Sequence, residues 1–350
     1  MSETIHFGLL GCGMIGPLHA DAIASLPDAE VSAVVDVVLE RAETLAARCG
    51  ARAYTDLDTM LASENIEVVI IGLPSGMHGE YACRAMRAGC HVIVEKPMEI
   101  RREALDEMLR VQQETGRKLA VISQRRFDPG VQQVRKLIDE GALGRLVVAN
   151  AVVPWWRSQG YYDSGAWRGT WSLDGGGILM NQAIHCIDLF QWMMGPVKSL
   201  TAYTDTLVHQ METEDVAVAI LRFASGALGT ISATTGAYPG LAMRLELFGN
   251  QGSVVLTDGE LDYLHLARDE QEAPGAYGLK EKIGQVPRTA SAASDPAALA
   301  ARSHALQIAD MLQAIREDGT PLVDGQAGRH PVEIILGIYE SSRTGREVML

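Results

Sequence analysis

The chain has 350 residues, of which 47% are hydrophobic and 21% charged, so it can bury a large core, and its length predicts two or three domains. The 30 Lys and Arg against 44 Asp and Glu leave a net charge of −14. This balance argues against sequence-independent binding to nucleic acid or to an anionic membrane, because both need a basic surface.

The cysteine count and the start of the chain suggest neither metal binding nor export. The five cysteines are an odd number without CxxC spacing, so neither a disulfide framework nor a zinc site is expected, and we expect no metal. The start of the chain has no basic segment followed by a long apolar one, and the apolar runs are too short to cross a bilayer. We therefore expect a cytoplasmic protein with neither signal peptide nor membrane span.

Strand and helix signals alternate over the first third of the chain. Apolar strands separated by helices are typical of a parallel sheet covered on both faces, here a Rossmann-type α/β domain. The expected strands are residues 5–10, 31–35, 68–73, 91–94 and 119–123, and the expected helices are residues 17–25, 42–48, 80–88 and 104–115.

The pattern then changes to strands with few helices between them, which predicts an α+β domain with an open-faced, mostly antiparallel sheet. We expect a boundary after residue 124, giving domains 1–124 and 125–350, with a polar surface loop over 268–298. The expected strands are 146–153, 199–206, 215–223, 227–234, 243–248, 253–257 and 261–266, and the helices are 129–139, 177–194, 303–316 and 331–344, of which the last two could pack back on the first domain.

A glycine loop follows the first strand. Gly11, Gly13 and Gly16 form a GxGxxG that opens a helix, and Asp36 closes the second strand 20 positions later. In this context the motif predicts a dinucleotide site: the glycines let the backbone approach a pyrophosphate, and the acid accepts hydrogen bonds from the ribose. Because Asp36 would repel a 2′-phosphate, we expect NAD rather than NADP. A glycine turn without a ligand is the alternative.

A lysine and a histidine are candidates for catalysis. Lys96 follows a buried strand whose carboxyl end faces the ligand crevice, and Pro97 after it allows a cis bond. Lys96 could contact a substrate hydroxyl, or it could be an ordinary surface lysine. His185 shares a helical face with Asn181 and lies three residues before Asp188. It could act as a proton acceptor, or it could be a buried structural histidine paired with Asp188.

Acidic and histidine residues also gather between 205 and 215. A metal site there is less expected than solvated loop and strand ends. The residues concerned are Asp205, His209, Glu212 and Asp215.

The motifs together resemble the Gfo/Idh/MocA oxidoreductases over nearly the whole chain. Within that family, residues 161–182 look most like the WlbA-type enzymes, which oxidise the 3-hydroxyl of UDP-N-acetylglucosaminuronic acid. The motifs that carry the resemblance are Gly11–Gly16, Pro74-Ser75-Gly76-Met77-His78, Ala88–Val92 with Glu95-Lys96-Pro97, Gly175–Gly177 through Asp188, and Tyr339-Glu340-Ser341.

The resemblance implies roles for single residues. Lys96 and His185 match the catalytic lysine and histidine, whereas Asn181 stands where many members carry an aspartate, which leaves the chemistry to Lys96 and His185. The implied cofactor residues are Gly11, Gly13, Met14, Ile15, Gly16, Asp36, Leu73, Pro74, His78, Glu95, Lys96 and Gln124. The candidate substrate residues are Arg125, Tyr162, Trp167, Arg168, Asn181 and Gln182, of which Trp167 and Arg168 match a pair that commonly lies close to the nicotinamide or the substrate. Arg125, Arg126 or Arg168 could meet an anionic group because arginine binds carboxylate or phosphate, and the aromatic residues clustered around Tyr162 could stack on a sugar or could equally belong to the core.

These residues predict an NAD-dependent oxidoreductase that oxidises a ring hydroxyl, with C3 as the expected position, of a sugar or sugar nucleotide. A dehydrogenase of a free sugar, glycoside or inositol is the first alternative. A non-catalytic NAD-sensing regulator is the second, although intact Lys96 and His185 argue against it. The family also implies a homodimer or homotetramer that packs through the open sheet.

Overall fold

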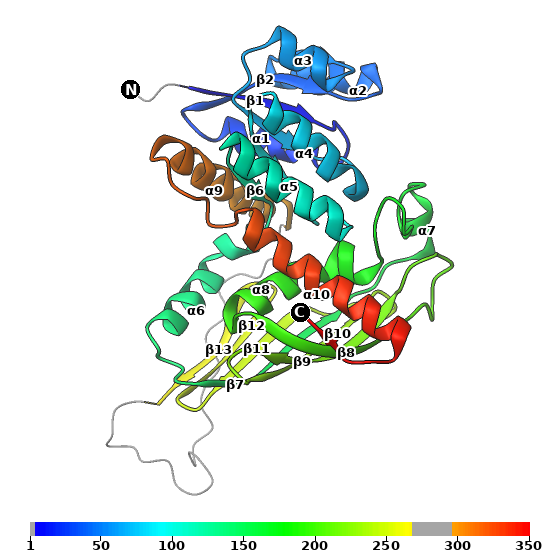
Figure 1. Ribbon diagram of the computed structural model, residues 1–350, viewed down its shortest axis with the longest axis vertical. Coiled ribbons are helices and arrows are strands. Elements are labelled where there is room, and N and C mark those ends of the chain that lie inside the picture. The colour runs from blue at the N-terminus through cyan, green and yellow to red at the C-terminus, as the bar shows by residue number, and fades with distance from the viewer. Residues whose placement is uncertain (1–3, 268–295) are drawn as a thin grey trace, which may run out of the picture. The chain divides into compact units, whose positions relative to one another are not determined.

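The computed structural model describes residues 4–267 and 296–350, which form two compact units. The first unit contains residues 4–124, 164–181 and 296–333. The second contains residues 125–163, 182–267 and 334–350. The chain thus leaves the first unit after Gln124 and returns to it twice, which can be followed by colour in Figure 1.

The first unit is built on a six-stranded parallel sheet in the order β3-β2-β1-β4-β5-β6. This order reverses direction between β1 and β4, and in such sheets ligands bind outside the carboxyl ends of the strands at the reversal point. The strands are β1 (Ile5–Leu10), β2 (Ala29–Val35), β3 (Arg52–Tyr54), β4 (Val68–Ile71), β5 (His91–Val94) and β6 (Leu119–Val121).

Helices cover both faces of this sheet. On one face, α1 packs against α9, and the apolar core there includes Phe7, Ile23 and Ile308. On the other face Gly8 lies so close to Met60 of α3 that a Cβ would come within 2.7 Å of its terminal methyl. The helices are α1 (Gly16–Ala24), α2 (Leu39–Cys49), α3 (Leu57–Ser63), α4 (His78–Arg87), α5 (Arg102–Thr115) and α9 (Pro296–Arg316), with a short 3₁₀ turn at Ser75–Met77.

The second unit contains an eight-stranded sheet in the order β13-β12-β11-β7-β10-β9-β8-β14. Its pairs are antiparallel except for β7 with β10, which run parallel. The strands are β7 (Leu146–Pro154), β8 (Val197–Asp205), β9 (Val216–Phe223), β10 (Leu228–Thr234), β11 (Arg244–Gly249), β12 (Gly252–Thr257), β13 (Glu260–Leu266) and β14 (Val348–Met349).

One face of this second sheet packs against helices, and on the other face, within the described residues, alternate side chains are exposed. Burial alternates along β9 and β10, as expected for a sheet with one packed face. Phe190 of α8 packs on the inner face against Phe223 and over Gly229. The helices that remain are α6 (Pro129–Asp139), α7 (Gln159–Asp163), α8 (Ile184–Met194) and α10 (Gly325–Thr344), with a 3₁₀ turn at Gln124–Phe127.

The expected fold class is confirmed: a parallel Rossmann sheet precedes a mostly antiparallel mixed sheet. Three local features differ from expectation. The short elements β3, α3, α7 and β14 have too few apolar residues to show a period and were not predicted. The helix expected at 177–194 begins as a π-helix over Ile178–Ala183 and continues as α8. Most of the expected loop at 268–298 lies outside the described residues, and its last three positions begin α9.

Among the described residues, no helix combines the length and the apolar character needed to cross a membrane.

Candidate functional site

The glycine loop is tight at two glycines and open at the third. Gly11 has a φ of +102°, and a Cβ there would lie 2.5 Å from the carbonyl oxygen of Gly72. A Cβ at Gly16 would lie 2.7 Å from the carbonyl oxygen of Gly11. At Gly13 nothing lies within 4 Å of the Cβ position, and the residue is exposed three positions before α1 begins. The loop therefore leaves free space beside the helix N-terminus, where an anionic pyrophosphate is stabilised.

Asp36 ties the end of β2 to this loop. Its Oδ2 accepts a hydrogen bond from the backbone N–H of Cys12 at 3.0 Å, and its Oδ1 accepts one from Val38 at 2.9 Å. Each carboxylate oxygen can still accept a second bond, which suits a ribose hydroxyl. Burial, together with the charge of Asp36, raises the pKa of the Cys12 thiol to about 12, so that thiol stays neutral.

His78 joins the loops that follow β4 and β5. Its Nδ1 lies 2.7 Å from the carbonyl oxygen of Pro97, and its Nε2 lies 2.9 Å from that of Leu73. Burial of the ring lowers the pKa of His78, and the two contacts with carbonyl oxygens oppose this shift. Because both ring nitrogens face backbone carbonyls, His78 shapes the two loops from within.

Lys96 lies at the end of β5, before a cis peptide bond to Pro97. Its Nζ donates a hydrogen bond to the carbonyl oxygen of Asn181 at 2.9 Å. Burial lowers the pKa of Lys96, whereas the negative charges of Glu95 and Asp174 raise it. The lysine is therefore a partly desolvated cation under the influence of two carboxylates, an environment in which the pKa of an amine responds to small changes.

Asp174 is absent from the residues that the sequence singled out as site candidates. Its side chain is only 1% exposed. Oδ1 accepts from the Asn181 side-chain amide and Oδ2 from the Gly169 N–H, both at 2.9 Å. Burial raises the pKa of Asp174, and these two bonds together with the charge of Lys96 oppose that rise. The position directly before Gly175–Gly177 was the signal that could have identified it.

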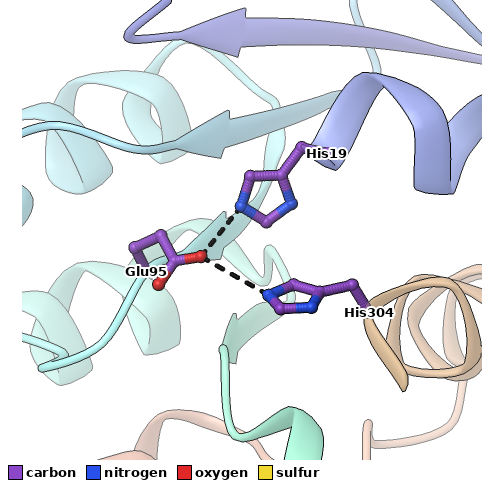
Figure 2. A group of neighbouring side chains, drawn as sticks. All are labelled: His19, Glu95 and His304. Carbon is purple, nitrogen blue, oxygen red and sulfur yellow. Dashed lines mark hydrogen bonds and ion pairs between the residues drawn. The ribbon is translucent and has the colours of Figure 1, made fainter. Parts of the chain in front are cut away.

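Glu95 belongs to a buried cluster with two histidines. Figure 2 shows the side chains of His19 and His304 directed at the carboxylate of Glu95. The His19 Nε2 lies 2.9 Å and the His304 Nε2 3.8 Å from Glu95 Oε1. The carboxylate thus faces protein side chains, whereas the family resemblance implied that Glu95 contacts the cofactor.

His185 lies half-buried in the first turn of α8, in the second unit. Asp188, one turn later, is buried and bound by Arg126 through Nε at 2.9 Å and Nη2 at 2.6 Å. The guanidinium of Arg126 also stacks on Trp192 at 5.0 Å. The expectation that Arg126 meets a substrate anion is therefore wrong, because the group is fully buried and already neutralised. Asp188 binds this arginine with both of its oxygens.

The expected substrate residues fall into both units. Trp167, Arg168 and Asn181 belong to the first, and the Arg168 guanidinium stacks on Trp167 at 4.5 Å. Tyr162 belongs to the second unit, where it is buried with its hydroxyl 2.8 Å from that of Thr235; burial raises the pKa of Tyr162 to about 12. It is therefore a packing residue. Arg125 donates to the Asp258 carbonyl, and Gln182 donates to the Tyr161 hydroxyl.

Two comparisons with known proteins bear on this geometry. Residues 5–123 match the oxidoreductase family with an NAD-binding Rossmann fold, and residues 131–255 match the GFO/IDH/MocA C-terminal domain. An inositol 2-dehydrogenase of Rhizobium meliloti is 33% identical over 258 residues, which cover 72% of this chain and 75% of the relative.

The chain belongs to the Gfo/Idh/MocA oxidoreductase family.

One solved structure and one further relative are also similar to this chain. The WlbA dehydrogenase of Bordetella pertussis, solved with NADH and UDP-GlcNAcA, superposes with a TM-score of 0.87 at 33% identity and covers 100% of this chain and 99% of that one. A D-glucoside 3-dehydrogenase of Escherichia coli is 31% identical over 58% of each chain. This protein is accordingly a dehydrogenase with an NAD-binding Rossmann domain.

The first unit fits the NAD cofactor of the Gfo/Idh/MocA family. The open space over Gly13 suits the pyrophosphate, and the fixed carboxylate of Asp36 suits the adenosine ribose. Gln124, at the carboxyl end of β6, has a buried Oε1 that accepts no hydrogen bond from the described part of the chain. Met14 is 86% exposed beside Gly13, while Ile15, Leu73 and Pro74 are half-buried next to the loop.

The segment around residues 205–215 is more ordered than expected. The prediction of solvated loop and strand ends is wrong for His209 and Asp215, which are buried. Asp215 accepts hydrogen bonds from the backbone N–H groups of Leu207, Val208 and His209, each at 2.8 Å. The His209 Nδ1 lies 3.0 Å from the same carboxylate. The carboxylate closes this loop and gives the segment a structural role.

Proposed function

We propose that this dehydrogenase oxidises the C3 hydroxyl of a sugar nucleotide that carries negative charge, of the kind represented by UDP-N-acetylglucosaminuronic acid. The observation that supports this most is the match along the full length of the chain to the Bordetella pertussis WlbA enzyme, at 33% identity. The stacked Trp167 and Arg168 add to it, because an arginine binds carboxylate or phosphate and an aromatic ring packs on a sugar face.

In the proposed reaction NAD supplies the acceptor for the hydride that leaves the sugar carbon. Lys96 donates a hydrogen bond to the reacting hydroxyl and stabilises the negative charge that develops on its oxygen. His185 accepts the hydroxyl proton, since an imidazole can do so near neutral pH. Asp174 accepts a hydrogen bond from the side chain of Asn181, and Lys96 donates one to the Asn181 carbonyl oxygen. These two bonds fix the chain four residues before His185.

Oxidation of a free inositol is the second candidate function. It is supported by the 33% identity to an inositol 2-dehydrogenase. The two candidates differ in what the substrate carries: an inositol has neither pyrophosphate nor carboxylate, so it would gain little from Arg168. The ratio of activities on the two substrate classes therefore separates them.

The test is a substrate panel with NAD, in which formation of NADH is followed by absorbance. UDP-N-acetylglucosaminuronic acid, UDP-N-acetylglucosamine, methyl glucosides and myo-inositol are compared by kcat/KM, and NMR of the product locates the new carbonyl. We expect the acidic UDP-sugar to be the best substrate and the carbonyl to be at C3. A higher kcat/KM for myo-inositol, or a carbonyl elsewhere on the ring, contradicts the proposal.

Two variants test the assigned roles. Lys96→Met and His185→Asn should each lower kcat by about 10²–10⁴-fold, the usual effect of losing a charge-stabilising group or a general base. Lys136→Met, at an exposed lysine of α6, is the matched control and should retain full activity. Near-normal turnover of both site variants would rule out this chemistry.

We also propose that the enzyme forms a homodimer or homotetramer through the open face of its second sheet. Apolar side chains on exposed positions of neighbouring strands support this, because a large exposed apolar patch is typical of an interaction surface. They are Val147 and Val148 of β7, Tyr203 of β8, Val218 and Ile220 of β9, and Leu228 of β10.

A further inference from the structure

A buried carboxylate with two imidazoles lies directly beside the proposed catalytic lysine. Its three residues come from distant parts of the sequence: His19 from α1, Glu95 from the end of β5, and His304 from α9. Their side chains are 1%, 9% and 3% exposed, and all three residues belong to the first unit. Figure 2 shows the rings of His19 and His304 converging on one oxygen of Glu95.

The other oxygen of Glu95 faces Lys96. Oε2 accepts a hydrogen bond from the Lys96 backbone N–H at 3.0 Å. Burial alone would raise the pKa of Glu95, but the two histidines outweigh this and hold the pKa well below its ordinary value. Glu95 is therefore ionised, and its negative charge raises the pKa of Lys96 against the lowering effect of burial. Glu95 thus stabilises the charged form of Lys96 and also accepts a hydrogen bond from the Lys96 backbone N–H.

We propose that His19 and His304 are positioning residues for Lys96: they keep the Glu95 carboxylate charged and oriented so that Lys96 remains an ammonium during oxidation of the substrate. This inference rests on the proposed role of Lys96 in the reaction. It assigns the two histidines a part in turnover although their rings face Glu95. It also links α9, from the C-terminal part of the chain, to the reactivity of a loop near residue 96.

A metal site built from the same three residues is less well supported. A metal-bound histidine normally donates its second ring N–H to a carboxylate, carbonyl or water. The His19 Nδ1 is buried and has no hydrogen-bond partner in the described part of the chain. The 2.9 Å separation of His19 Nε2 from Glu95 Oε1 is that of a direct hydrogen bond. The arrangement therefore suits a hydrogen bond from imidazole to carboxylate better than an ion.

Other charged groups set how large the effect on Lys96 can be. Asp174 also favours its charged form, whereas Arg168 disfavours it. On the Glu95 side, His78 of α4 feels the same carboxylate, as do His19 and His304. Since Asp174 remains in place and also raises the pKa of Lys96, loss of the Glu95 charge should lower this pKa only in part. A nearby charge typically shifts a pKa by about 1–3 units.

The experiment measures kcat as a function of pH in the full-length enzyme, with the NAD dissociation constant as a second readout. Glu95→Gln should move the alkaline limb of kcat down by about one pH unit or more. His304→Leu should move it in the same direction by less, because the carboxylate loses one of two imidazoles. His304→Gln keeps an N–H donor near Oε1 and should restore the wild-type profile. NAD affinity should change by less than about threefold in the two His304 variants, because His304 belongs neither to the glycine loop nor to the implied cofactor residues.

Lysine labelling tests the same point without turnover. The rate at which acetic anhydride modifies Lys96, followed by mass spectrometry across pH, reports its ionisation. We expect the midpoint to fall in Glu95→Gln and in His304→Leu, and to return in His304→Gln. Absence of substrate oxidation by wild-type enzyme, with these midpoints moving as expected, would count against the proposed function alone.

Three results would overturn the inference itself. The first is an unchanged Lys96 midpoint in Glu95→Gln. The second is a fall in kcat that is the same at every pH and is not restored by His304→Gln, which indicates a purely structural cluster. The third is one equivalent of zinc or iron in the purified protein, with loss of activity on chelation, which indicates a metal site.

Discussion

The buried ion pair between Arg126 and Asp188 allows a quantitative test of the second unit. Both side chains are almost completely buried, at 2% and 3% exposure, and two hydrogen bonds join them. Arg126→Met keeps much of the volume and removes the charge. The variant then holds an unpaired carboxylate in the interior, and loss of one partner of a buried pair costs about 3–5 kcal/mol. Lost stacking on Trp192 adds to this, by about 0.5–2 kcal/mol.

The free energy of unfolding is measured by urea denaturation, together with the thermal midpoint. For a unit of about 150–250 residues, the combined loss of about 3.5–7 kcal/mol corresponds to a fall of roughly 7–28 °C. Arg110→Met is the matched control: it removes an arginine that pairs with Glu107 and Glu114 on an exposed helix face. Exposed pairs contribute about 0–1 kcal/mol, so its midpoint should barely change.

The double variant Arg126→Met/Asp188→Leu separates the two parts of the cost. With both charges removed, no group is left buried and unpaired, so it should be clearly more stable than Arg126→Met alone. The reasoning is refuted if Arg126→Met loses no more stability than Arg110→Met. It is also refuted if removal of Asp188 in the second step lowers stability further.

Three other outcomes follow from the structure. Gly13→Ala should leave the thermal midpoint unchanged, because nothing lies near its Cβ position, yet it should weaken NAD binding at least about tenfold by filling the pyrophosphate space, as calorimetry can measure. Gly16→Ala should instead lower the thermal midpoint, because its Cβ would meet the carbonyl oxygen of Gly11. Ile220→Glu, on the open sheet face, should reduce the molar mass found by light scattering to that of a monomer, and a monomeric wild type would contradict the proposed interface. The pKa of Asp215 is lowered because its backbone hydrogen bonds outweigh the effect of burial. Its contribution to the free energy of unfolding is therefore present above its ordinary pKa of 3.8 and is lost as pH falls through the lower folded value. The difference in stability between wild type and Asp215→Asn should be constant from about pH 8 to 5 and shrink below that, and a difference that grows on acidification would contradict this.

Local signals in the sequence were sufficient for the Rossmann part of the fold. Alternating apolar strands and amphipathic helices have distinct periods, so β1, α1 and β2 follow from short windows. The glycine loop could be predicted because its spacing follows an apolar strand and opens a helix, and because the close approach of Gly16 to the Gly11 carbonyl oxygen lies within the loop itself. The apolar runs that predict β2 and β5 also placed Asp36 and Lys96 just beyond the carboxyl ends of these strands.

Partners of buried charges could not be predicted in this way. His185 and Asp188 are close along a helix, yet Asp188 binds Arg126, which lies 62 positions earlier. Tyr162 was expected near the substrate because aromatic residues cluster there, but tertiary packing buries its hydroxyl against Thr235. Helical spacing states which side chains share a face and says nothing of the element that covers it.

The sequence by itself therefore determined the fold class, the cofactor loop and the position of the lysine, because each leaves a recognisable pattern within a short window of sequence. Only the tertiary structure decided how that lysine is surrounded. Asp174 reaches the Lys96 neighbourhood through Asn181, and His19 and His304 meet at Glu95 from opposite ends of the chain. A buried charge must be neutralised by whatever group folding brings within hydrogen-bond distance, and sequence spacing does not record that distance.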